Sequence, residues 1–128
     1  MPQSAGLHED AKLLKPETID RHRAIVSLGE ELEAIDWYDQ RVDAAGDEQL
    51  KQILAHNRDE EKEHFAMTLE WLRRKDAKLD EVLREYLFVD GDVLEVEEAV
   101  EHAGGSRAAR DLGLGSLRGQ DDAPEGAS

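Results

Sequence analysis

The stretch Val42-Asp43-Ala44-Ala45-Gly46-Asp47-Glu48-Gln49-Leu50 separates two long segments with helical periodicity, and it decides the fold. Glycine is common directly after the last residue of a helix, so Gly46 predicts a stop, and Asp47 is a favourable N-cap for the next helix. We therefore expect one helix over about residues 17–45 and a second over about residues 47–76. Because their connection is so short, the two helices must fold back on each other as an antiparallel hairpin.

The segments that flank the hairpin are shorter or less regular. Residues 1–15 are polar and unpatterned, which predicts a flexible N-terminus before a helical domain over residues 16–89. Apolar residues at helical spacing predict a short third helix over about residues 79–88. Residues 90–128 hold seven of the ten glycines and ten acidic residues against three arginines, which is typical of a flexible acidic tail, although a short helix over about residues 93–103 also fits. The fold class is all-α.

Composition and charge limit the possible functions. The formal charge of −15 argues against a nucleic-acid partner, because binding phosphates needs a basic stripe. The charge suits attraction of cations, or solubility alone. Without cysteine, a metal site must use oxygen and imidazole ligands. No apolar run approaches the ~18 residues of a membrane span, and no signal peptide is evident, so we expect a cytoplasmic protein with no membrane partner.

The second helix carries a motif that can bind a metal. Glu61 and His64 are three residues apart, so their side chains face the same way, and a carboxylate with an imidazole at this spacing can hold an iron ion. Both lie within an apolar stripe, where an ionised carboxylate is costly unless it is paired or bound to metal. The first helix has a similar stripe, with Glu31 at its edge between Leu28 and Ile35.

The chain has half of the ligands of a di-iron carboxylate bundle. Such a bundle takes a Glu from each of two helices and a Glu-x-x-His from each of the other two. Two hairpins related by a two-fold axis would complete a ferritin-like four-helix bundle as a homodimer, and Glu31 and Glu61 from both chains would neutralise two ferrous ions. The low hydrophobic content, 39%, also favours assembly. A solvated acidic helix that only happens to contain Glu61 and His64 remains the alternative.

Four blocks carry a family resemblance: RHRAIVS at 21–27, EELEAIDWYDQR at 30–41, AHNRDEEKEH at 55–64 and MTLEWLRR at 67–74. Over roughly residues 16–88 the chain closely resembles the encapsulated ferritins, half-ferritins carried inside bacterial encapsulin shells. The resemblance implies a ferroxidase centre shared between two subunits, with Glu31, Glu61 and His64 as metal ligands and catalytic residues. It also implies an annular decamer built from five dimers.

Four other residues of the first helix are candidates for roles around the centre. Glu30 and Glu33 lie on the opposite side of the first helix from Glu31, and the resemblance implies that metal enters there; a solvated acidic face is the alternative. Trp37 is expected at a subunit interface beside the centre. Tyr38 lies on the same face as Glu31 and is expected either to hydrogen-bond a ligand or to pack in the core.

The tail contains an island of leucine and glycine in an acidic stretch, within about residues 109–120. Its members are Leu112, Gly113, Leu114, Gly115, Ser116, Leu117 and Arg118. The island resembles encapsulin-targeting peptides, which share its Gly-Ser-Leu core, and so implies an encapsulin shell protein as partner. The alternative is a flexible terminus with stray leucines.

Together these features predict a ferroxidase that oxidises Fe(II) to Fe(III) with dioxygen at a di-iron centre. The oxidised iron would be stored inside an encapsulin nanocompartment in the bacterial cytoplasm. Two other functions remain open. Another di-metal enzyme, such as a peroxidase, would differ in the oxidant consumed per iron. A non-enzymatic acidic scaffold that sequesters metal would show saturable uptake without turnover.

Overall fold

The computed structural model describes residues 6–103. The elements are the 3-10 helix η1 (Ala11–Leu13) and the α-helices α2 (Pro16–Ala44), α3 (Glu48–Lys75), α4 (Ala77–Tyr86) and α5 (Val93–His102). The chain divides into two units, Met1–Asp80 and Glu81–Ser128, and α4 spans the boundary between them. The architecture is all-α, a long hairpin followed by short helices, as the sequence predicts.

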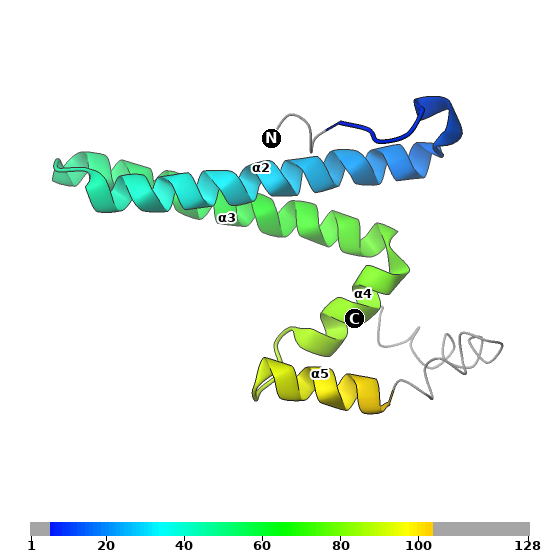
Figure 1. Ribbon diagram of the computed structural model, residues 1–128. Coiled ribbons are helices and arrows are strands. Elements are labelled where there is room, and N and C mark those ends of the chain that lie inside the picture. The colour runs from blue at the N-terminus through cyan, green and yellow to red at the C-terminus, as the bar shows by residue number, and fades with distance from the viewer. Residues whose placement is uncertain (1–5, 104–128) are drawn as a thin grey trace. The chain divides into compact units, whose positions relative to one another are not determined.

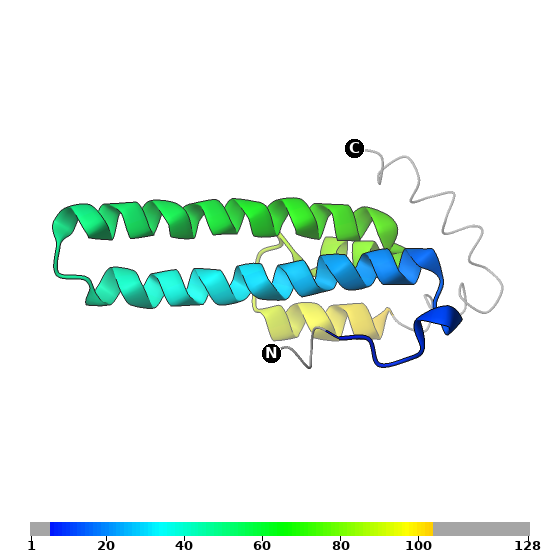
Figure 2. The same ribbon diagram turned by 90° about the horizontal axis from the view of Figure 1, so that it is seen from above.

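The hairpin of α2 and α3 is the main feature of the first unit. The two helices run antiparallel and side by side, as both views show (Figures 1 and 2). Pro16 occupies the first turn of α2, where its missing N–H costs no hydrogen bond. After Ala44 the chain leaves the helix through Ala45 in an extended conformation (φ −69°, ψ 138°). Gly46 therefore follows the helix as expected, but it does not take the left-handed conformation common at this position.

The start of α3 confirms the predicted N-cap. The Asp47 carboxylate accepts a hydrogen bond from the backbone N–H of Leu50 at 2.8 Å. Further along α3, Arg58 reaches across to α2 and forms an ion pair with Asp39 at 3.0 Å. The Asp47 cap marks the start of α3, and the Arg58 ion pair links α3 to α2 at the surface.

The third and fourth helices also begin with aspartate caps. Asp76 accepts a hydrogen bond from the N–H of Leu79 at 3.0 Å, so α4 starts two residues before the predicted Leu79. It ends at Tyr86 rather than near Phe88, because Phe88 has a φ of 60° and so leaves the helical region. The Asp92 side chain caps α5, which matches the short acidic helix considered from the sequence.

The N-terminal segment contains one element that the sequence did not predict. Residues 11–13 form the 3-10 helix η1, and the Asp10 side chain accepts a hydrogen bond from the N–H of Lys12 at 3.0 Å. Among the helices of residues 6–103, none has the length and apolar character needed to cross a bilayer.

The hairpin leaves most of its apolar residues at the surface. Within the described part of the chain, only Ala24 and Leu72 are buried hydrophobic residues. The exposed large apolar residues of the hairpin are Ile25, Leu32, Trp37, Leu50, Ile53, Met67 and Trp71. The predicted stripes of both helices are therefore only partly covered within one chain.

Candidate metal centre

Glu31 lies on α2 and turns its carboxylate toward α3. Its Oε2 accepts a hydrogen bond from the Thr68 hydroxyl of α3 at 3.4 Å, which is long for such a bond. Its Oε1 is buried and has no hydrogen-bond partner. A buried carboxylate oxygen without a donor is costly, and a bound cation would remove that cost.

Glu61 and His64 lie on α3 and face the same way, as their spacing predicts. The Nδ1 atom of His64 is 3.6 Å from Oε1 of Glu61. Neither side chain is enclosed by the single chain, because 26% of the Glu61 side chain and 48% of the His64 side chain are exposed. The pair is therefore within reach of a ligand or of another subunit.

The pKa of Glu31 depends on groups of both helices. Burial raises the pKa of the Glu31 carboxyl above its ordinary value, and the negative charges of Glu61 and Glu30 add to the rise. The Thr68 hydrogen bond and the proximity of His64 act in the opposite direction and lower this pKa, without cancelling the rise. Glu31, Glu61 and His64 are therefore close enough to interact, and a cation between the carboxylates would relieve their repulsion.

These three side chains suit iron, but one chain does not enclose it. Carboxylate oxygen and imidazole nitrogen are donors that iron accepts, and the unpartnered Oε1 of Glu31 is available to it. Within residues 6–103 of a single chain, however, no group of three or more His, Cys, Asp or Glu side chains is arranged to hold a metal ion. The described residues of one chain therefore do not form a complete metal site.

The remaining predicted site residues of α2 differ in their exposure. Glu30 is exposed, Glu33 is partly buried, and Trp37 is 50% exposed. The Tyr38 ring contacts the Arg41 guanidinium, whose central carbon is 5.2 Å from the ring centroid. Within the described residues, no hydrogen bond joins Tyr38 to Glu31, Glu61 or His64.

Thr68 is the site residue that sequence reasoning missed. It lies four residues after His64 and seven after Glu61, so it continues their face of α3. This spacing on α3 could have indicated that Thr68 belongs to the site. The spacing does not show that the Thr68 hydroxyl reaches Glu31, because that contact depends on how α2 and α3 are rotated against each other.

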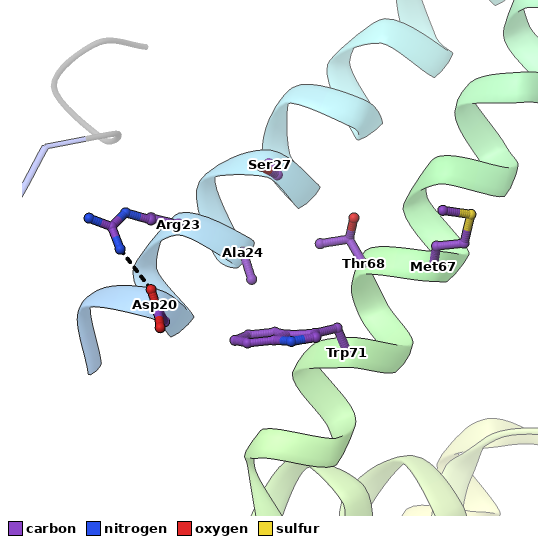
Figure 3. A pocket seen from close by; sticks show the side chains of 7 residues that line it. All are labelled: Asp20, Arg23, Ala24, Ser27, Met67, Thr68 and Trp71. Carbon is purple, nitrogen blue, oxygen red and sulfur yellow. Dashed lines mark hydrogen bonds and ion pairs between the residues drawn. The ribbon is translucent and has the colours of Figure 1, made fainter. Parts of the chain in front are cut away.

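Thr68 also lines an open pocket of about 370 Å³ between the two helices. Figure 3 shows Ala24 of α2 facing Thr68 and Trp71 of α3. Ser27 also lines the pocket, and Asp20 and Arg23 form an ion pair at 2.7 Å nearby. The predicted targeting residues, 112–118, lie outside the described residues.

Comparison with known proteins gives consistent matches. The sequence profile of the EncFtn-like family matches residues 6–90. An encapsulated ferritin-like protein of Rhodospirillum rubrum is 57% identical over 131 aligned positions, which cover 94% of each chain. A ferritin-like protein of Thermotoga maritima is 50% identical over 86% of this chain and 96% of its own. An encapsulin nanocompartment cargo protein of Myxococcus xanthus is 33% identical over 92% of this chain and 99% of its own.

One solved structure is also similar to this chain. The crystal structure of a Nitrosomonas europaea protein matches with a TM-score of 0.66 and 59% identity, covering 68% of this chain and 96% of that chain. The family profile and the identities confirm the resemblance that the four sequence blocks carry. The chain belongs to the EncFtn-like family, the family of the encapsulated ferritin-like proteins.

Proposed function

We propose that this protein is a ferroxidase that oxidises Fe(II) to Fe(III) at a di-iron centre shared between two copies of the chain. The observation that carries the proposal is the buried, unpartnered Oε1 of Glu31. The Glu61 and His64 pair of α3 is close enough to influence the pKa of this carboxyl. A bound cation would satisfy this oxygen, and the oxygen and imidazole donors suit iron.

The exposed apolar stripes support the pairing of two chains. Residues such as Leu32 and Ile53 are each 51% exposed in a strongly charged protein, and a second hairpin would cover them. Pairing two hairpins brings a second Glu31, Glu61 and His64 to the site, which completes the ligand pattern of di-iron bundles. Four carboxylates would then balance the charge of two ferrous ions.

The residues have separate roles in the proposed reaction. Glu31 and Glu61 would bind the ferrous substrate with carboxylate oxygens, which also favour the more highly charged ferric product. His64 would supply a nitrogen ligand and limit the number of negative charges around the iron. Oxidation of two ferrous ions releases two electrons, which with two protons reduce one dioxygen molecule to hydrogen peroxide.

The wider assembly is part of the same proposal. The annular decamer of five dimers is the assembly that the family resemblance implies, and we include it in the proposal. The relationship to an encapsulin nanocompartment cargo protein supports packaging inside a shell. Ferric product would then be stored in the shell lumen. The segment over residues 109–120 is the proposed address for the shell protein.

Catalytic turnover tests the proposed reaction. Excess ferrous iron should be oxidised in many cycles per dimer, with oxygen consumption measured in parallel. Uptake that stops at a fixed number of ions per chain would contradict an enzyme and favour a metal-sequestering scaffold. Preferential consumption of hydrogen peroxide over dioxygen would instead indicate a peroxidase.

Glu30 and Glu33 should affect the supply of iron rather than its oxidation. Both lie on α2 away from the Glu31 ligand position, and we propose that they form the site where metal enters. Glu30→Ala and Glu33→Ala should slow oxidation at low Fe(II) concentrations or alter the metal preference, and saturating Fe(II) should restore the rate. Stopped-flow measurement over a range of Fe(II) concentrations checks this.

A matched control for this prediction is Asp43→Ala, which removes an exposed acid from the far end of α2. It should leave the concentration dependence unchanged. A loss of rate at saturating Fe(II) as large as that in Glu61→Ala would show that Glu30 or Glu33 belongs to the centre itself.

A further inference from the structure

We propose that Thr68 is a positioning residue that fixes the orientation of the Glu31 carboxylate and thereby keeps its Oε1 atom available for metal. This inference rests on the proposed function, because it concerns the same centre. It assigns a role to a side chain that is not itself a ligand in the proposed site.

The two oxygens of Glu31 have different surroundings. Oε2 accepts the hydrogen bond of the Thr68 hydroxyl, whereas Oε1 is buried and receives no hydrogen bond. A hydrogen-bond donor at Oε2 alone restricts rotation of the carboxylate and leaves Oε1 to bind a cation. Hydrogen bonds to ligating carboxylates are a common means of orienting them.

The position of Thr68 suits this role. It is partly buried on α3, on the helical face of Glu61 and His64, and its bond to Glu31 crosses between the two helices. It therefore couples the carboxylate of α2 to the helix that carries the other two proposed ligands. In Figure 3 the Thr68 side chain extends from α3 toward α2, into the space beside Ala24.

The alternative is that Thr68 only fills space between α2 and α3. Thr68→Val and Thr68→Ser separate the two roles, because valine keeps the shape without the hydroxyl, and serine keeps the hydroxyl without the methyl. A positioning role predicts that serine preserves function and valine does not, and a packing role predicts the reverse. Ser27→Ala is the matched control, since Ser27 lines the same pocket from α2.

The test uses the full chain and Co(II) as the probe, with binding followed by its visible absorption. Thr68→Val should raise the Co(II) dissociation constant roughly 10-fold and change the absorption spectrum, as expected for loss of a residue that orients a ligand. Thr68→Ser and Ser27→Ala should stay close to wild type. Fe(II) oxidation by the same proteins should show a raised KM in the valine variant, rescued in the serine variant.

Circular dichroism and native mass would establish that each variant is folded and assembled. If valine perturbs assembly, Thr68→Ala removes the hydroxyl without adding bulk and should show the same loss of affinity. Wild-type affinity and spectrum in Thr68→Val, with normal iron oxidation, would overturn the positioning role and leave the proposed function intact. Wild-type protein that neither binds Co(II) nor oxidises iron would overturn both.

Discussion

Glu61→Ala and His64→Ala should each lower the rate of Fe(II) oxidation by roughly 100-fold or more, since losing even a residue outside the ligand set commonly costs 10–100-fold. Each substitution removes a proposed ligand from both halves of the shared centre. Glu31→Ala should have an effect of the same size. The rate is measured from the appearance of ferric absorbance under saturating Fe(II) and oxygen.

The loss of oxidation rate should come from damage to the metal centre and not from unfolding of the protein. Alanine favours helices, and the side chains of Glu61 and His64 are partly exposed, so helical content by circular dichroism should hardly change. His56→Ala is the matched control on the same helix, because His56 is an exposed residue paired with Glu60 at 3.5 Å. An oxidation rate near that of wild type in Glu61→Ala or His64→Ala would contradict the ligand assignment.

A chain that ends at Ala103 should keep its oligomeric state and its iron oxidation but fail to enter the encapsulin shell. None of the proposed ligands lies beyond His64, and all five described helices lie before residue 103. The removed segment contains the Leu and Gly island over residues 112–118. Co-expression with an encapsulin, followed by shell purification and quantification of cargo, measures loading, which should fall to background.

Two further chains make this test specific. Residues 109–120 fused to an unrelated soluble protein should carry that protein into the shell. The full chain with Leu112, Leu114 and Leu117 replaced by Asp should not be loaded, because these leucines are the proposed apolar anchors in the groove of the shell protein. Normal loading of the truncated chain would contradict the addressing role.

The hairpin could be predicted because its determinants are local. Gly46 and Asp47 mark the end of one helix and the start of the next, and the Asp47 cap is present as expected. The Glu61 and His64 pair could be predicted for the same reason, because a spacing of three residues fixes their common direction on any helix. Such features need no knowledge of how the helices pack.

Features that depend on packing could not be predicted. The contact between Thr68 and Glu31 requires the rotation of α2 against α3, which periodicity leaves open. Similarly, the apolar stripes indicated buried positions, but Ile25 and Ile53 are more than half exposed in the single chain. The sequence pattern cannot say whether an apolar face is covered within a chain or by another one. The early end of α4 depends on the left-handed Phe88, which no residue preference indicates.

The proposed centre is shared between two chains, so the most direct measurement compares iron oxidation by monomer and dimer. Metal-free protein is diluted and separated by size. The oligomeric state of each fraction is then determined by native mass measurement before and after anaerobic addition of Fe(II). We expect no turnover in monomer fractions, turnover in dimers and larger assemblies, and two irons per dimer at the centre. Iron should also shift monomer toward dimer, because binding across an interface favours the associated state. Full turnover by a stable monomer that holds two irons would contradict the account.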